Sequence, residues 1–180
     1  MQLTVTERVM LSNQYALLSA VDPDNSAYYD RLQRIVQEGF ELHYAEVAEQ
    51  ICKDEDTVSD AQCRFVLDVL SVFDAIDQAV KKHGLPEGVA EHSARFSGFD
   101  GNNEHNLMAY AQFYCRGRCH ESRFESIIGE NFEYNSHCPM TDIYDRMLVV
   151  WKGVSAESKH DLSVSQVASI CAARTHPDNR

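Results

Sequence analysis

Two carboxylates, Asp100 and Glu104, stand four residues apart beside a stretch rich in glycine and asparagine. Paired carboxylates can act as general acid and general base when burial separates their pKa values. The same carboxylates can instead stabilise the N-terminus of a following helix, through capping and the helix dipole. We favour this structural interpretation. The sequence has no nucleophile elbow, phosphate-binding glycine loop or HExxH motif, and no catalytic residue is predicted.

A small-ligand pocket or an enzyme site near Asp100 and Glu104 is the alternative hypothesis. Polar side chains from several segments would line it. The complete candidate set is Asn13, Gln14, Tyr15, Arg95, Asp100, Glu104, Tyr144 and Arg146.

Cysteine and histidine residues suggest a second chemistry, a structural zinc site. Cys115 and Cys119 lie four residues apart with His120 adjacent, and His137 and Cys138 follow. Zinc takes four nitrogen or sulfur ligands in a tetrahedron, often as two close pairs. The second pair here is consecutive, which is poor geometry for one ion, and a thiol on an apolar helix face behaves as a small hydrophobe. We therefore predict no metal and no cofactor.

Residues 46–66 resemble a helix-turn-helix in residue types and in the ten-residue offset between Ala48 and Val58. A small residue lets two helices pack closely in such motifs. Against DNA binding, Cys52 occupies the usual glycine position, and acidic side chains at 54–56 and 60 would face phosphate oxygens. An ordinary helix corner is favoured, and DNA binding is kept as a further alternative.

Asn13 and Gln14 interrupt an apolar helical stripe. Helical spacing places them among Met10, Leu17 and nearby apolar residues. A buried amide without a partner costs about 1–3 kcal/mol, so we expect partners inside the chain, across a subunit contact or in a ligand.

The elements that position these residues are helices, because the helical period dominates the sequence. Serine or threonine caps and glycine stops predict where each helix begins and ends. The first predicted helix is capped by Thr6 and has an apolar stripe of Met10, Leu11, Leu17, Leu18 and Val21. The second begins at Ser26 and ends at Gly39, and the longest, 60–83, is capped by Ser59 with Gln62 and ends before Gly84. Further helices are predicted over 42–52, over 104–115, from Thr141, and from Ser163 to about 173.

The predicted fold is all-α, a multihelical single domain over residues 1–180. Two irregular segments are expected, at 85–103 and 116–140, and the tail 175–180 is expected to fray. Helix 60–83 has the widest apolar arc, which predicts that it is central.

Composition limits the function. The chain has 180 residues and a net charge of −12, so its surface repels phosphate backbones and anionic lipid. The N-terminus lacks the basic and apolar regions of a signal peptide, and no apolar run is long enough to span a membrane. We therefore expect a cytoplasmic protein that binds no membrane, and read its six cysteines as thiols.

Several segments together are similar to the YfbU family of uncharacterised bacterial proteins, over nearly the whole chain to about residue 173. They are Leu11-Ser12-Asn13-Gln14-Tyr15, Arg31-Leu32-Gln33 with Gly39, Phe96-x-Gly98-Phe99-Asp100 with Glu104 and Tyr110, and Pro139-Met140-x3-Tyr144-x-Arg146-Met147-Leu148-x2-Trp151. The resemblance implies an all-helical cytoplasmic protein that self-associates, with no assigned reaction. Some relatives carry a helix-turn-helix domain, which suggests that the YfbU part senses a ligand or a partner.

The leading hypothesis is therefore a non-enzymatic binding or regulatory protein that acts as a homo-oligomer. Its partners would be further copies of itself, together with an unidentified small ligand or protein.

Overall fold

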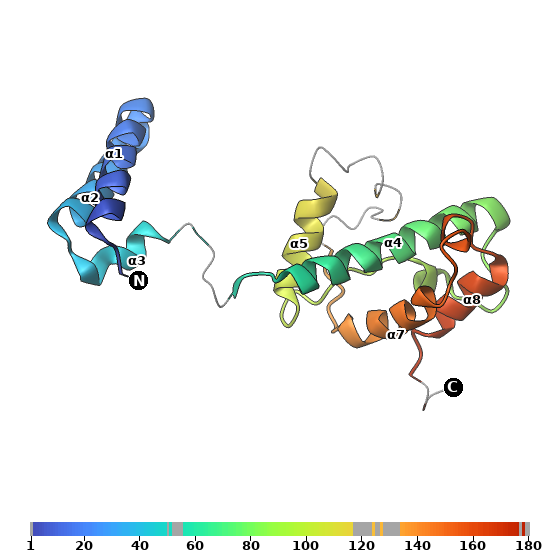
Figure 1. Cartoon of the computed structure of the whole chain (residues 1–180). Coiled ribbons are helices and arrows are strands. Elements are labelled where there is room, and N and C mark those ends of the chain that lie inside the picture. The colour runs from blue at the N-terminus through green and yellow to red at the C-terminus, as the bar shows by residue number, and fades with distance from the viewer. Residues whose placement is uncertain are drawn as a thin grey trace. The chain divides into compact units, whose positions relative to one another are not determined.

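The computed structural model describes residues 2–49, 51, 56–116, 124, 127, 134–176 and 178. Within these residues the secondary structure is helical, and the only extended pairing is an isolated parallel bridge between Phe99 and Asn135. The all-α prediction is confirmed (Figure 1). By its contacts the chain divides into two compact units, Met1–Thr57 (unit 1) and Val58–Arg180 (unit 2).

Unit 1 is a helical hairpin followed by short turns. Its helices are α1 (Val5–Val21), α2 (Ser26–Glu38) and α3 (Tyr44–Val47), with 3-10 turns at Pro23–Asn25 and Glu41–His43. Gly39 ends α2 in the left-handed conformation, as predicted.

Two boundaries predicted for unit 1 were wrong. The first helix is capped by Thr4 instead of Thr6, because the Thr4 hydroxyl and the Glu7 carboxylate form a reciprocal capping box. The helix predicted over 42–52 contains only the four residues of α3 after a 3-10 turn, and Gln50 and Cys52 lie outside the described residues.

The core of unit 1 lies between α1 and α2. Its buried members are Tyr15, Leu32, Ile35, Val36 and Tyr44. Helix α1 contributes mainly Tyr15 and the buried Ser12 to this contact, while α2 contributes three aliphatic side chains. The stripe predicted to face inward is therefore mostly outside the core: Met10 is 59% exposed, Leu17 66% and Val21 80%.

Unit 2 contains the remaining helices. They are α4 (Asp60–His83), α5 (His105–Arg116), α7 (Thr141–Lys152) and α8 (Val164–Ala172), with 3-10 turns at Glu91–Ala94 and Ser158–His160. The reciprocal capping boxes predicted at Ser59 and Ser163 are both present, and α4 has the predicted bounds. Helix α4 ends at His83 and Gly84 is its C-cap residue, as predicted.

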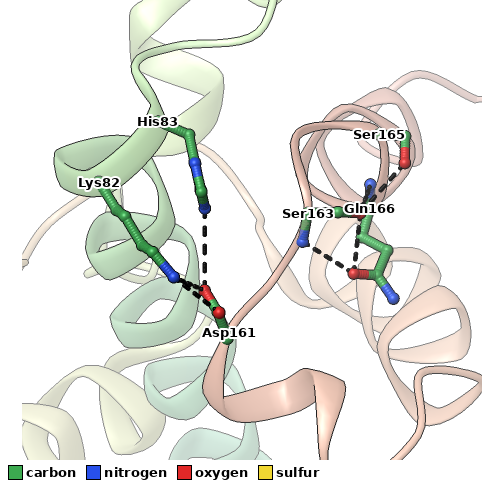
Figure 2. Close-up of polar contacts among 6 residues, drawn as sticks. All are labelled: Lys82, His83, Asp161, Ser163, Ser165 and Gln166. Carbon is green, nitrogen blue, oxygen red and sulfur yellow. Dashed lines mark hydrogen bonds and ion pairs between the residues drawn. The ribbon is translucent and has the colours of Figure 1, made fainter.

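Helix α4 is central to unit 2, as its wide apolar arc predicted. It contacts α5, α7 and α8, and buries residues on several sides, including Val66, Leu70, Phe73 and Ile76. At its C-terminal end, Lys82 Nζ lies 2.7 Å from the carboxylate of Asp161, just before α8. Figure 2 shows this ion pair beside the capping box of Ser163 and Gln166.

Part of the irregular segment predicted over 85–103 is fixed by a close backbone approach. Phe99 N–H donates to Tyr134 O at 2.9 Å, and Ser136 N–H donates to Phe99 O at 3.1 Å. Gly98 has a φ of +88°, and a Cβ placed there would lie 2.0 Å from Tyr134 O. Only glycine fits this position, because both the conformation and the space exclude a side chain.

Candidate functional site

The two carboxylates that first suggested catalysis are buried in unit 2. Asp100 is 3% exposed and Glu104 is 9% exposed. Both lie where the irregular segment meets the start of α5, and both are used as backbone caps.

Glu104 caps a helix distant in sequence. Its carboxylate accepts hydrogen bonds from Met140 N (2.9 Å), from Thr141 N (2.7 Å) and from the Thr141 hydroxyl (2.6 Å). Thr141 was predicted to cap α7, but it is the first helical residue, and Met140 at the N-cap forms no side-chain cap. Glu104 therefore satisfies two of the free N–H groups at the start of α7, those of Met140 and Thr141.

The same Glu104 carboxylate also binds its own loop. Asp100 N–H donates to it at 2.9 Å. Asp100 in turn accepts from Asn102 N–H at 3.1 Å and from the Asn103 side-chain amide. The two carboxylates thus tie the loop, the start of α5 and the start of α7 together through hydrogen bonds to ionised oxygens.

These contacts favour the ionised form of both groups. Burial alone raises the pKa of Glu104, but the hydrogen bonds from Thr141, Asp100 and Met140 outweigh burial, so the pKa lies below its ordinary value. The Asn103 and Asn102 hydrogen bonds lower the pKa of Asp100 as well. Neither group has the raised pKa of a general acid, and their acceptor positions are occupied.

A cavity of about 450 Å³ opens beside Glu104, between the starts of α4 and α5. Its wall includes Phe65, Asn103, His105 and Thr141. Of the eight predicted ligand-binding residues, Glu104 is the one that lines this cavity.

The remaining candidates in unit 2 also serve the fold. The Tyr144 hydroxyl donates to Gly98 O at 2.9 Å and accepts from Ser97 N–H at 3.3 Å, and burial raises the pKa of Tyr144. Arg146 donates to the carbonyls of Ala173 (3.1 Å) and Arg174 (2.7 Å) at the end of α8.

Arg95 lies apart from these residues. Its exposed guanidinium pairs with Glu91 one turn earlier. The structure therefore brings Asp100, Glu104 and Tyr144 together around the segment 97–104, whereas Arg95 and Arg146 make separate contacts.

The other three candidates lie in unit 1. Tyr15 is buried in the core between α1 and α2. Asn13 and Gln14 are exposed, and within the described part of the chain their amides have no hydrogen-bond partner. The buried amide that lies between α1 and α2 comes from α2: Gln37 Nε2 donates to the Ser12 hydroxyl at 3.0 Å, and Gln33 Nε2 donates to Ser12 O at 3.2 Å.

Asn13 and Gln14 belong to an exposed surface on α1. The sequence analysis recognised the apolar stripe on this side of the helix but expected it to face the core. We call this surface the outer face of α1. All its residues are exposed and none is charged: Val5, Thr6, Val9, Met10, Asn13, Gln14, Ala16, Leu17, Ala20 and Val21. The outward side of α2, by contrast, carries Asp30, Arg31, Arg34 and Glu38.

The outer face of α1 continues into a groove against α2. This groove has a volume of about 350 Å³, and Val5, Val9, Asn13 and Val36 are among its lining residues. Arg8 closes one side, with its guanidinium directed to Val36 O at 3.4 Å. A contiguous exposed apolar surface is a common feature of interaction sites.

The zinc site that was considered, and not predicted, involves residues that the structure describes only in part. Cys115 is buried, and burial raises the pKa of its thiol to about 11. Among the described residues no group of three metal-binding side chains comes together. Cys119 and His120 lie outside those residues.

The DNA-binding segment 46–66 is described only at its two ends. Ala48 follows α3 instead of lying within a helix, and the acidic residues 54 and 55 lie outside the described residues. DNA binding therefore stays a prediction. Within the part of the chain that is described, no helix combines the length and apolar composition needed to cross a membrane.

The described part of the chain is thus a helical protein in which two carboxylates cap backbone N–H groups and one face of α1 is exposed and uncharged. The chain belongs to the YfbU family, because the family model described as the YfbU domain matches residues 1–173. It is 31% identical over 173 residues to the UPF0304 protein MJECS11 of Methanocaldococcus jannaschii, covering 95% of this chain and 99% of that relative. Neither name states a reaction or a ligand.

Proposed function

We propose that this protein is a non-enzymatic binding or regulatory protein that acts as a homo-oligomer. The observation that carries the proposal is the outer face of α1, where five large apolar side chains are exposed: Val5, Val9, Met10, Leu17 and Val21. Burial of apolar area stabilises by about 25 cal/mol per Å² before the entropic cost of association, so covering this face favours association.

The charge pattern supports association through this face in particular. Helix α1 has only two charged residues, Glu7 and Arg8, both in its first turn or next to it, while the outward side of α2 is charged. Depletion of charge at the centre of a surface is typical of a protein–protein interface. A solvated helix normally presents charged side chains to water.

The chemistry of the carboxylates supports a non-enzymatic function. The carboxylate oxygens of Glu104 and Asp100 accept hydrogen bonds from backbone and side-chain donors of the same unit. A ligand that bound these oxygens would compete with the donors that they already bind, which for Glu104 include the start of α7. The small-ligand site near Asp100 and Glu104 therefore stays the second hypothesis, supported by the cavity of about 450 Å³ beside Glu104.

Light scattering of the purified chain tests the proposal. We expect a mass above that of one 20.4 kDa chain at micromolar concentration, which falls towards the single-chain mass on dilution. A mass of one chain throughout the micromolar range would overturn the homo-oligomer.

A further inference from the structure

The cavity beside Glu104 is built from the starts of three helices. Its lining residues come from the first two turns of α4, from residues 103–107 at the start of α5, and from Thr141 at the start of α7. All of them belong to unit 2, so the cavity lies within one compact unit. Its volume of about 450 Å³ lies within the range of about 300–1,000 Å³ that is typical of small-molecule sites.

The charge of the lining disfavours ions as ligands. The described residues that line the cavity include no lysine or arginine, so an anion would meet the ionised Glu104 without a basic side chain to compensate it. The Glu104 oxygens already accept hydrogen bonds from Asp100, Met140 and Thr141, and a cation would compete with these donors. The lining therefore favours a ligand without net charge.

Three side-chain amides line the cavity, and each has hydrogen-bonding capacity that the fold leaves unused. Gln62 Oε1 accepts from Ser59 N–H at 2.9 Å, which leaves the Gln62 NH₂ group as a donor. Asn103 donates to the Asp100 carboxylate through its NH₂ group, which leaves Oδ1 as an acceptor. Asn106 is half-buried, and within the described part of the chain neither atom of its amide has a partner. A ligand in the cavity would therefore meet both donors and acceptors.

An apolar wall lies beside these amides. Phe65 and the buried Leu107 both line the cavity. The Phe65 ring packs against that of Phe99, with centroids 6.2 Å apart, so it is held in place from the core side. Aromatic side chains bind flat rings by stacking. An asparagine or glutamine amide binds a ring edge on which a donor and an acceptor are adjacent, as in the recognition of adenine.

We infer that this cavity binds a neutral planar ligand whose ring edge carries an adjacent donor and acceptor, the chemistry of a nucleobase or nucleoside. Asn106 binds the edge of the ring, Gln62 and Asn103 supply further hydrogen bonds, and Phe65 stacks on the ring. The two buried carboxylates hold the loop in place rather than binding the ligand. This site is independent of the proposed homo-oligomer, and it gives the small-ligand hypothesis a ligand class and a set of contacts.

Titration of adenosine, guanosine, cytidine and uridine into the full chain, followed by NMR chemical shifts, tests the site. At least one nucleoside should bind the wild type at millimolar concentration or below. Asn106→Leu removes both hydrogen-bonding atoms of the amide, and should weaken that binding about tenfold or more. Asn102→Leu is the matched control, because Asn102 is exposed in the same loop and does not line the cavity, and it should leave the binding unchanged.

A second variant and a second ligand test the stacking and the charge. Phe65→Leu keeps an apolar wall but removes the aromatic face, and should weaken the binding at least about fivefold. The monophosphate of the nucleoside that binds best should bind more weakly than the nucleoside, because its charge is repelled by Glu104. Circular dichroism checks that each variant keeps its helices, and if one variant unfolds, the other decides.

Each result decides the inference. Binding that weakens in Asn106→Leu and Phe65→Leu, but not in Asn102→Leu, supports the site. The absence of nucleoside binding at millimolar concentration overturns it, as does binding that Asn106→Leu leaves unchanged. Tighter binding of the monophosphate would contradict the neutral ligand. The proposed homo-oligomer is judged separately, because its test is the mass of the chain without any nucleoside.

Discussion

The two polar regions that the sequence offered as sites differ in one physical respect. Asp100 and Glu104 are buried, and their oxygens accept hydrogen bonds from the same unit. Asn13 and Gln14 are exposed on an apolar face and have no partner within the described residues. A saturated polar group contributes to the fold, whereas an unsaturated one amid apolar surface remains available for binding. We therefore expect the first region to affect stability, and we propose that the second contacts a further copy of the chain.

The largest expected effect is on the carboxylate that caps α7. Glu104→Ala leaves the N–H groups of Asp100, Met140 and Thr141 without their acceptor, so we expect the free energy of unfolding to fall by about 3 kcal/mol. Urea denaturation followed by circular dichroism measures the change. The exposed Glu157→Ala is the control and should change it by less than about 0.5 kcal/mol. Equal small effects for both variants would contradict the capping function of Glu104.

Lowering the pH of the wild-type protein should also remove the stabilisation that the ionised Glu104 carboxylate provides. The pKa of Glu104 is lower folded than unfolded, so the ionised group stabilises the fold above its unfolded pKa, and this stability is lost as pH falls through the folded pKa. We expect the free energy of unfolding to decrease between about pH 5 and pH 3. The decrease should be shallower in Glu104→Gln, which cannot titrate. If the free energy of unfolding fell equally steeply with pH in the wild type and in Glu104→Gln, this explanation would be wrong.

A smaller loss is expected from the buried tyrosine beside the loop. Tyr144→Phe removes the hydroxyl that bridges Gly98 O and Ser97 N–H, at an expected cost of about 1–2 kcal/mol. Thermal unfolding measures it. Tyr29→Phe, whose partly buried hydroxyl has one longer contact of 3.3 Å to Asp22, should lose less. The reverse order would show that the Tyr144 hydroxyl does not support the loop.

The smallest effect on stability is expected on the outer face of α1. Leu17 is 66% exposed in the chain, so Leu17→Ala should change the unfolding free energy of the dilute protein by less than about 0.5 kcal/mol. Leu32→Ala, in the core of unit 1, should cost about 2–5 kcal/mol. Similar losses for the two variants, measured by denaturation at low protein concentration, would mean that Leu17 already packs within one chain.

Much of the fold could be predicted from local signals. The bounds of α4 follow from a capping box, a wide apolar arc and Gly84, and all three act within the helix itself. The cap of α7 could not be predicted, because its acceptor, Glu104, lies 36 residues or more from the groups that it binds. Nor do Gly98 and Tyr134 show their contact in the sequence, since it depends on how the loops meet.

The sequence analysis named some residues of the candidate site correctly as neighbours, but it did not predict which side of α1 packs against α2. The carboxylates and Tyr144 do lie together, but Glu104 caps α7, whereas it was expected to stabilise the helix that directly follows it. The stripe on α1 was recognised by its period, but period alone does not show which side of a helix packs within its own chain. Ser12 and Tyr15 form the contact with α2 and leave the more apolar side outside.

The most direct test of the account is the dissociation constant of Leu17→Glu, measured by sedimentation equilibrium. A charge in the centre of the outer face should raise this constant at least about 100-fold over the wild type. Val149→Glu is the control. Val149 is 73% exposed on α7, with the charged Asp145 and Lys152 about one helical turn before and after it, so this variant should leave the dissociation constant unchanged. Equal dissociation constants for the wild type and Leu17→Glu would contradict the claim that a second copy covers the outer face of α1.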